Sequence, residues 1–384
     1  MNAQDTAASA PAAAPATQRT GPVGVGIIGA GVISTQYLDN LTTFADVVVH
    51  AIGDLFPEAA KARAEQYGIA VHGTPEDVLS HPEVEIVVNL TIPAAHVPVA
   101  QSAVRAGKHV WSEKPFSLDR ASGRELLAEA EAAGLLLGCA PDTFLGAGLQ
   151  SARRAIEAGV IGTPLTALTL FHVPGPEAWH PSPEFLFQAG AGPLLDMGPY
   201  YLTALIQTFG SIRRVAAMGT RSRDQRTIAT GPKAGTAFDV TVPTHVGALI
   251  EFESGQQAQS IFSFQSELKR MGWIEISGTE GTLSLPDPNM FDGELRLMRA
   301  GADEWEVLEL EGSTAGRGQG VLDMARAIRA GRAHRAQGAL AFHVVDALLA
   351  IEQSAATGEF VAVESSAPVV PALPAEWDPA AATL

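Results

Sequence analysis

The sequence feature that most constrains the fold of this chain is a glycine turn in the segment Val23–Ser34, whose sequence is VGVGIIGAGVIS. Apolar residues on both sides of the turn are typical of a buried parallel strand that runs directly into a helix. Gly29 permits the tight turn, and Gly31, which has no side chain, lets a phosphate group approach the backbone amides at the helix N-terminus. Ser34 stands where a third glycine is usual, and that position needs only a small residue.

An acidic residue at the end of the next apolar run favours a nucleotide site. The glycine turn alone also fits an ordinary strand–turn–helix connection that binds nothing. Asp54 closes the run that starts at Val47, about 20 to 25 residues beyond the glycines, where a carboxylate can accept hydrogen bonds from the ribose hydroxyls of a dinucleotide. Because no Arg or Lys directly follows Asp54, NAD is favoured over NADP. The predicted cofactor contacts in this region are Gly29, Gly31, Val32, Ile33, Asp54 and Leu55.

Composition narrows the class of protein. A chain of 384 residues with 46% hydrophobic and 17% charged residues is long enough for two domains with a large core. The formal net charge of −17 disfavours nucleic acid and anionic lipid surfaces as partners. The single cysteine, Cys139, precludes an intrachain disulfide and fits a reducing compartment. Since we find neither a signal peptide nor an uninterrupted apolar run of about 18 residues, we expect a cytoplasmic protein.

The order of strand and helix patterns divides the chain into parts. Residues 1–22, rich in Ala, Pro, Thr and Gln, are expected to form a flexible tail. Residues 23–140 alternate apolar runs with helical patterns, which predicts a Rossmann domain with a doubly wound parallel sheet. Its strands are expected at 23–28, 46–52, 85–91, 108–112 and 135–139, with helices near 32–42, 57–67, 75–80, 95–106 and 119–133.

In residues 141–364 the strand patterns follow one another instead of alternating with helices, which predicts a second α/β domain. After a helix near 146–158, strands joined by short turns predict a large, mainly antiparallel, open sheet. They are expected at 165–172, 213–219, 244–252, 257–266, 272–278, 282–285, 294–299 and 304–310. Two late apolar stripes, Val321–Ile328 and Leu340–Ile351, indicate core helices. Residues 365–384 form a Pro/Ala-rich tail that is expected to lie along the surface.

One strand end of the first domain carries further candidates for cofactor binding. In open α/β sheets, ligands lie beyond the carboxyl ends of the strands. Thr91, Pro93 and His96 follow the run at 85–91 and can line the cofactor groove. Pro93 can equally serve only to begin a helix.

The next strand end carries a Glu-Lys pair followed by proline. We predict Glu113 at the nicotinamide ribose and Lys114 at both the cofactor and the substrate hydroxyl, with a surface ion pair as the simpler alternative. Desolvation and the charge of NAD⁺ are expected to lower the pKa of Lys114, which would suit proton transfer.

Five patterns together resemble one family, the glucose-fructose oxidoreductase / inositol dehydrogenase (Gfo/Idh/MocA) family. They are the glycine turn, Asp54, the segment from Pro93 to His96, the Glu113-Lys114-Pro115 triplet, and the sequence GAGPLLDMG at 190–198. The resemblance covers residues 23 to about 355. It implies a Rossmann domain, a second domain with an open sheet, and an NAD-dependent oxidoreductase. The expected reaction is hydride transfer at a secondary hydroxyl or ketone of a sugar, glycoside or inositol.

The resemblance also implies catalytic residues. Lys114 matches the lysine of the family's Glu-Lys-Pro pattern, and Asp196 matches the carboxylate of its glycine-rich pattern. Tyr200 stands where many members have a catalytic histidine. Three proton carriers therefore remain open. We place Lys114 first, with Tyr200 hydrogen-bonding the reacting oxygen and His180, in the Pro-rich loop before Asp196, binding or assisting.

Other side chains are expected to bind the substrate. Asp142 and Thr143 follow the last strand of the first domain and suit sugar hydroxyls, and Trp179 can stack on a sugar ring. Asp196, Tyr200 and His180 are also expected to contact the substrate. We predict no metal site, because the histidines are scattered without metal-ligand spacing.

Two other functions fit the same residues. One is a redox-neutral enzyme that keeps NAD tightly bound, oxidises its substrate transiently and then eliminates or cleaves a group. The other is a non-catalytic NAD-binding sensor. In each case a homodimer or homotetramer is expected through the C-terminal sheet, because an open sheet face is available to a partner and family members pair through it.

Overall fold

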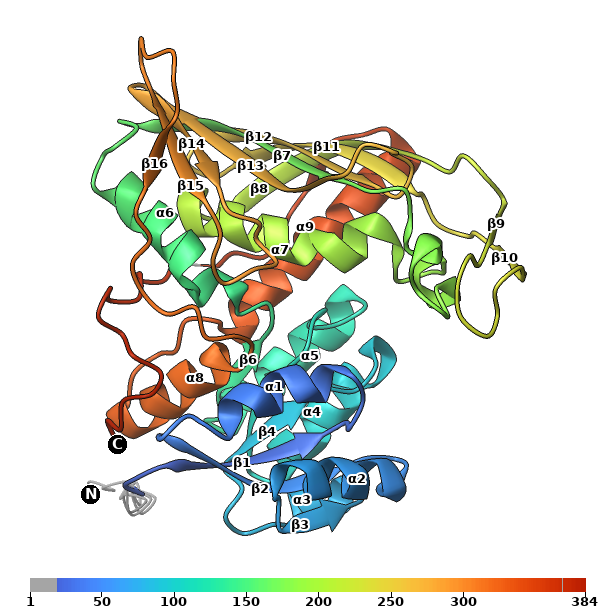
Figure 1. Ribbon diagram of the computed structural model, residues 1–384, viewed down its shortest axis with the longest axis vertical. Coiled ribbons are helices and arrows are strands. Elements are labelled where there is room, and N and C mark those ends of the chain that lie inside the picture. Colours follow the sequence, from blue (N-terminus) through green and yellow to red (C-terminus); the bar gives the residue numbers. More distant parts are fainter. Residues whose placement is uncertain (1–18, 368) are drawn as a thin grey trace, which may run out of the picture.

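The computed structural model describes residues 19–367 and 369–384, so most of the predicted N-terminal tail lies outside the described part of the chain. Two sheets lie one above the other in Figure 1, the smaller at the bottom and the larger at the top. Three helices of the second half lie between them: α6 (Ala147–Glu157), α7 (Gly192–Phe209) and α9 (Gly338–Thr357).

The smaller sheet is parallel throughout, in the order β3-β2-β1-β4-β5-β6. Every residue of β1 is buried, as expected for the centre of a sheet with helices on both faces. The strand order reverses between β1 and β4, which is where such sheets bind ligands. The strands are β1 (Val23–Ile28), β2 (Val47–Gly53), β3 (Val71–Gly73), β4 (Ile86–Asn89), β5 (His109–Ser112) and β6 (Leu137–Cys139). The helices are α1 (Ile33–Leu41), α2 (Pro57–Tyr67), α3 (Pro75–Leu79), α4 (His96–Arg105) and α5 (Arg120–Ala132).

The larger sheet has the order β16-β15-β14-β13-β7-β12-β11-β8-β17. Its neighbours are antiparallel except for β7 and β12, which are parallel. The predicted fold class is therefore confirmed. The strands are β7 (Pro164–His172), β8 (Ile212–Thr220), β11 (His245–Phe252), β12 (Gln257–Ser263), β13 (Arg270–Gly278), β14 (Gly281–Leu285), β15 (Leu295–Arg299), β16 (Glu306–Leu308) and β17 (Val361–Ala362). A separate hairpin of β9 (Gln225–Thr227) and β10 (Ala237–Asp239), helix α8 (Gln319–Ala330), and the short 3₁₀ turns Pro93–Ala95, Thr143–Leu145, Pro176–Ala178 and Glu184–Phe187 complete the fold.

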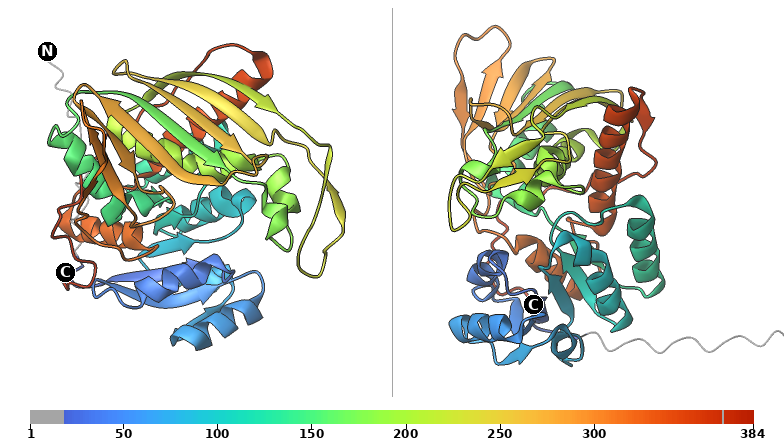
Figure 2. Two further views of the ribbon diagram at one scale, coloured as in Figure 1. Left: turned by 45° about the horizontal axis from the view of Figure 1, so that its top comes forward. Right: turned by 90° about the vertical axis from the view of Figure 1, so that its right-hand side faces the viewer.

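The two faces of the larger sheet differ. In β11, Val246, Ala248 and Ile250 are buried against the helices, while Leu249 points the other way and is 53% exposed. Figure 2 shows this outer face as a broad surface that the helices leave uncovered. Met218 on β8, which is 78% exposed, and Trp273 on β13 add to its apolar character. The outer face thus carries exposed apolar side chains, beside polar ones such as Gln259, and has no helical cover among the described residues.

Helix α7 is absent from the sequence-based expectations. Its sequence contains Pro199 in the interior and glycines at 192 and 198, residues that usually disfavour a helix. Close packing explains Gly198, because an added Cβ would lie 2.5 Å from Cδ2 of Leu348 on α9. The helix carries Asp196 and Tyr200 one turn apart, so both side chains lie on one face.

Helix α9 is long and apolar enough to cross a membrane by length and composition, and it is the one helix in residues 19–367 and 369–384 that meets this test. Most of it is buried against α7, α5 and β8. Asp346 in this helix is fully buried and pairs with Arg120 of α5. These contacts are those of a core helix.

The C-terminal segment runs over the second domain, where the Leu373 amide donates to Gln150, and its last residues reach the first domain (Figure 1). Asp46, which is buried beside β2, accepts hydrogen bonds from the Thr383 amide and hydroxyl and from the Leu384 amide. The same carboxylate lies 2.7 Å from Nε of Arg326 on α8. One buried carboxylate therefore fastens the chain end and α8 to the nucleotide-binding sheet.

Replacing Asp46 by alanine is expected to lower the free energy of unfolding by about 3 to 5 kcal/mol, because Arg326 would remain buried without its partner. Urea denaturation measures this, and Thr383→Ala, which removes one neutral donor, should cost only about 1 kcal/mol. Burial alone would raise the pKa of Asp46, but its hydrogen bonds from Thr383, Arg326 and Leu384 outweigh burial and lower the pKa. The stabilisation should therefore be present above about pH 4 and disappear as the pH falls further. Equal stability of Asp46→Ala and wild type at neutral pH would contradict this assignment.

Candidate active site

The glycine turn has the geometry that a dinucleotide needs. Gly29 has φ +108°, and a Cβ there would lie 2.7 Å from the carbonyl of Leu90, so this position requires glycine. A Cβ at Gly31 would meet no atom within 4 Å, so the space in front of its backbone is open to a ligand. Ser34 is buried and its hydroxyl donates to the Gly31 carbonyl, which shows why a small polar residue is accommodated at this point.

Asp54 lies next to this turn. Its Oδ2 accepts a hydrogen bond from the Ala30 amide at 2.8 Å, and its Oδ1 accepts one from the Phe56 amide. The carboxylate is partly exposed and keeps lone pairs for a ribose. Val32 and Leu55 are 85% and 83% exposed beside it, and Ile33 is half-buried. The residues present fit NAD, with amides for the phosphates, a carboxylate for the ribose and apolar walls.

The segment after β4 fits the predictions only in part. Thr91 is half-buried and its hydroxyl donates to Asn89, while Pro93 is exposed at the start of a 3₁₀ turn. His96 is buried, and its ring nitrogens lie 2.8 Å from the Pro115 carbonyl oxygen and 3.1 Å from the Thr91 carbonyl oxygen. Both ring nitrogens bind neighbouring loops, and the contact of His96 with the cofactor stays a prediction.

Glu113 is almost buried at the end of β5. Its Oε1 accepts a hydrogen bond from the hydroxyl of Tyr37 on α1, and its Oε2 accepts one from the Lys114 amide. Burial, reinforced by the charge of Glu113, raises the pKa of Tyr37 well above its usual value. Tyr37 also accepts from Nε1 of Trp111. This buried polar network was not predicted from the sequence.

Lys114 and Asp196 form an ion pair between the two domains. Lys114 Nζ donates to Asp196 Oδ1 at 2.8 Å and to the Asp196 carbonyl oxygen at 2.7 Å. Burial favours the neutral amine, but the charges of Asp196 and Tyr200 outweigh it and raise the pKa of Lys114. The expectation of a lowered pKa is wrong for the chain itself. Lys114 therefore stays protonated in this structure, which makes it less suited to accept the substrate proton than the sequence predicted.

Tyr200 lies between two cations. Lys114 Nζ is 5.4 Å from the centre of its ring, and the guanidinium carbon of Arg317 is 5.8 Å from it. The phenol oxygen accepts a hydrogen bond from Arg317 Nη2 at 3.2 Å. Arg317 comes from the glycine-rich segment before α8, and it is not among the site residues predicted from the sequence.

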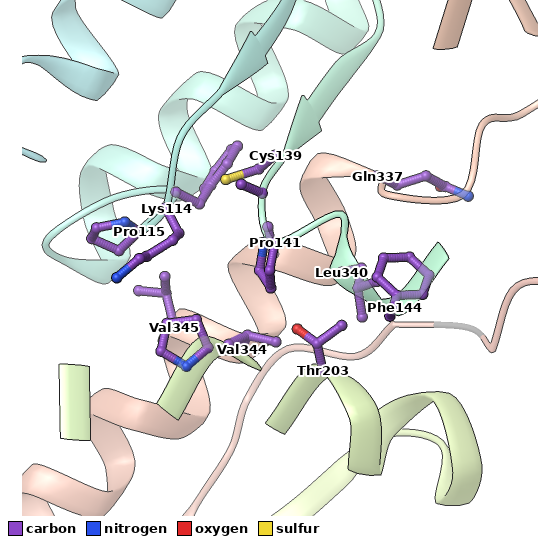
Figure 3. Close-up of a pocket in the computed structure, with 14 residues that line it drawn as sticks. Lys114, Pro115, Cys139, Pro141, Phe144, Thr203, Gln337, Leu340, Val344 and Val345 are labelled. Atoms are coloured by element: carbon purple, nitrogen blue, oxygen red, sulfur yellow. The ribbon is translucent and has the colours of Figure 1, made fainter. Parts of the chain in front are cut away.

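A small cavity of about 10 Å³ lies behind Lys114, between the two domains (Figure 3). Cys139, Pro141 and Thr203 are among the side chains around it, with apolar residues of α9 completing the lining. This volume holds about one water molecule, so the cavity is too small for a sugar. Burial raises the pKa of the Cys139 thiol, which favours its protonated, unreactive form.

Asp142 and Thr143 were predicted to bind substrate, but both are fully buried. Oδ2 of Asp142 accepts hydrogen bonds from the amides of Gly318 at 2.9 Å and Gly320 at 3.1 Å. Oδ1 is buried with no partner among the described residues, and substrate binding by Asp142 and Thr143 stays a prediction. Asp142 fixes the segment that carries Arg317.

Trp179 and His180 lie in the loop that follows β7. Trp179 is 67% exposed and its ring meets that of His180 edge to face at 5.5 Å. His180 also contacts Phe185, and its Nδ1 accepts from the Ser182 amide. These contacts keep His180 within its own loop, whereas the Trp179 ring is free to meet a ligand.

A doubly wound sheet with this glycine turn, together with a Lys-Asp-Tyr group at the domain junction, defines an NAD-binding oxidoreductase. Residues 23–140 match the family described as "Oxidoreductase family, NAD-binding Rossmann fold", and residues 149–284 match the "GFO/IDH/MocA C-terminal domain". The chain belongs to the Gfo/Idh/MocA family, as its sequence patterns suggested.

Named relatives are distant. The trans-1,2-dihydrobenzene-1,2-diol dehydrogenase of Mus musculus is 27% identical over 266 residues, which cover 67% of this chain and 72% of that protein. The 1,5-anhydro-D-fructose reductase of Ensifer adhaerens is 28% identical over 264 residues, covering 67% and 74%. A levoglucosan dehydrogenase solved with NADH and L-sorbose has a TM-score of 0.77 at 22% identity, covering 90% of this chain and all of that one, and shows the same fold.

Proposed function

We propose that this protein is an NAD-dependent dehydrogenase that acts on a secondary hydroxyl or ketone of a sugar, glycoside or inositol. The observation that carries the proposal is the junction of Lys114, Asp196 and Tyr200, beyond the strand ends of a nucleotide-binding sheet. The names of the relatives support it, because they describe enzymes for a cyclic diol, an anhydro sugar and levoglucosan.

Each residue of the group has a distinct role in this proposal. When bound, NAD supplies the acceptor or donor of the hydride. Gly29, Gly31 and Asp54 hold it at the turn. The ammonium of Lys114, fixed by Asp196, attracts the oxygen of the substrate and stabilises negative charge that develops on it. Tyr200 exchanges the proton with that oxygen.

A screen of aldoses, glycosides, inositols and cyclic diols with NAD tests the function. Formation of NADH, followed by its ultraviolet absorbance, together with a ketone product is the expected result. A converted substrate without net NADH would instead indicate the redox-neutral enzyme. NAD binding in calorimetry with no conversion across the panel would indicate the sensor. Trp179→Ala should raise KM with little change in kcat if that ring stacks on the substrate.

We also propose that the outer face of the larger sheet pairs two copies of the chain. Met218, Leu249 and Trp273 expose apolar surface on this face. Placing a charge at its centre with Leu249→Lys should convert a dimer or tetramer into smaller species, because an isologous contact would bury the lysine twice. Light scattering after size-exclusion chromatography measures the mass. A wild-type monomer at micromolar concentration would contradict the proposal.

A further inference from the structure

We propose that Arg317 is a positioning residue that prepares Tyr200 to act as the proton carrier in place of Lys114. This inference rests on the proposed dehydrogenase reaction. It names the residue that orients the phenol and holds its ionised form.

The contacts of Arg317 show how it reaches the phenol. Nη2 donates to the hydroxyl oxygen of Tyr200 at 3.2 Å and to Oδ1 of Asn289 at 3.0 Å, and Nε donates to Oε1 of Gln36 at 3.0 Å. Since Arg317 donates, the phenol oxygen acts as the acceptor in that bond. The O–H proton of Tyr200 is thereby left free to point toward a substrate oxygen.

Lys114 and Arg317 differ in the side chains that accept their hydrogen bonds. Lys114 is paired with the carboxylate of Asp196. Arg317 has neutral oxygens as its side-chain acceptors within residues 19–367 and 369–384, and its Nη1 is buried there without a partner. No carboxylate of the described residues thus accepts a hydrogen bond from the Arg317 guanidinium, which contacts the phenol directly, and a nearby positive charge favours the ionised form of an acid.

Arg317 keeps this charge. Burial by itself would lower its pKa, but the charges of Tyr200 and Glu113 outweigh burial and raise the pKa further. The ionisable groups around Tyr200 are Lys114 from the end of β5, Asp196 from α7 and Arg317 from the segment before α8. Glu113, Tyr37 and Asp142 act on Arg317 from the first domain.

The backbone on both sides of Arg317 is fixed. The Arg317 carbonyl accepts from Nδ2 of Asn40 on α1 at 3.0 Å. The next residue, Gly318, has φ +106° and donates its amide to the buried carboxylate of Asp142. The backbone bonds therefore hold the Arg317 side chain at a fixed position, from which its guanidinium group reaches the Tyr200 hydroxyl.

The proposed step is a proton transfer coupled to the dehydrogenase reaction. In the oxidation direction the substrate O–H bond breaks, and its proton passes to the ionised phenol oxygen of Tyr200. The O–H bonding pair becomes the second bond of the new carbonyl as the hydride leaves the carbon for the cofactor. Reduction reverses each transfer, with neutral Tyr200 as the acid.

Ionisation of Tyr200 can be measured without substrate or cofactor. The chain has four tyrosines, so the ultraviolet absorbance of tyrosinate in wild type minus that in Tyr200→Phe isolates one of them. Burial raises the pKa of Tyr37 and Tyr201, and that of Tyr67 is also raised, first by burial and then by its bond to Asp39, so these three ionise at high pH. Arg317→Gln should shift the Tyr200 titration upward by about 1 to 3 pH units.

Two variants separate charge from folding. Arg317→Lys keeps a cation and should change the Tyr200 titration less than Arg317→Gln does. Asn289→Asp places a carboxylate on Nη2 while leaving the arginine in place, so the Tyr200 titration should again move upward. Arg299→Gln, the same substitution on exposed β15, should leave it unchanged.

The pH dependence of kcat gives the second readout. The pH at which kcat for oxidation rises should move upward in Arg317→Gln by the same amount as the phenol titration. An unchanged titration in both Arg317→Gln and Asn289→Asp would overturn the inference, and Asn289→Asp alone decides if Arg317→Gln does not fold. If no substrate of the panel is converted, the proposed function fails while the titration still judges the role of Arg317.

Discussion

Replacing Lys114 by alanine is expected to lower kcat by about 10²- to 10³-fold, the loss seen when one fixed group that stabilises developing negative charge is removed. Affinity for NAD should change little, because the phosphate and adenosine contacts belong to the glycine turn and Asp54. The reason is structural: Lys114 is held as a cation by Asp196 at the domain junction. Steady-state kinetics and calorimetry with NAD measure the two effects separately.

The other end of the same strand offers a matched control. Lys108, just before β5, donates to the carbonyls of His81 and Val84, away from the strand end that carries Lys114. Lys108→Ala should leave kcat per folded enzyme unchanged. Wild-type turnover in Lys114→Ala, or equal losses in both variants, would remove Lys114 from the reaction.

Replacing Gly31 by leucine is expected to weaken NAD binding by a factor on the order of 100 or more, equivalent to at least about 2.7 kcal/mol. The new side chain would occupy the open space in front of the turn, where the pyrophosphate approaches the amides. Since a Cβ at Gly31 meets no protein atom within 4 Å, the fold should tolerate it. Calorimetry gives the affinity, and thermal unfolding without cofactor gives the stability.

A size series makes this result specific. Gly31→Ala should weaken binding less than Gly31→Leu, with the melting temperature of the cofactor-free protein nearly constant across the series. Gly29→Ala should behave differently and lower stability, because a Cβ there collides with the backbone at Leu90 and φ is positive. Tight NAD binding by Gly31→Leu would place the cofactor elsewhere.

The parts of the fold that were predicted from sequence are those with strong local periodicity. The β-branched runs of β1, β2 and β4 stand out, whereas β3, with the sequence Val-His-Gly, contains one apolar residue and leaves no pattern. Helix α7 was missed because Pro199 and its glycines oppose local helix preference. Packing against α9 offsets this low helix preference, and such a tertiary contact cannot be predicted from a short stretch of sequence.

The same distinction explains the site. Lys114, Asp196 and Tyr200 belong to short sequence patterns, and the structure brings them together. For His96 and Asp142, the location of the residue just after a strand predicts its role less well. This location gives the edge of the sheet on which the residue lies but not the direction in which its side chain points. Arg317 and Tyr200 are 117 residues apart in the sequence, and no sequence pattern around Arg317 indicates their contact.

The ion pair between Lys114 and Asp196 also bears on how such enzymes can be recombined. Lys114 comes from the nucleotide-binding domain and Asp196 from α7 of the second domain. A chimera that joins the first domain of one relative to the second domain of another would therefore be active only if α7 packs in the same position and restores this ion pair.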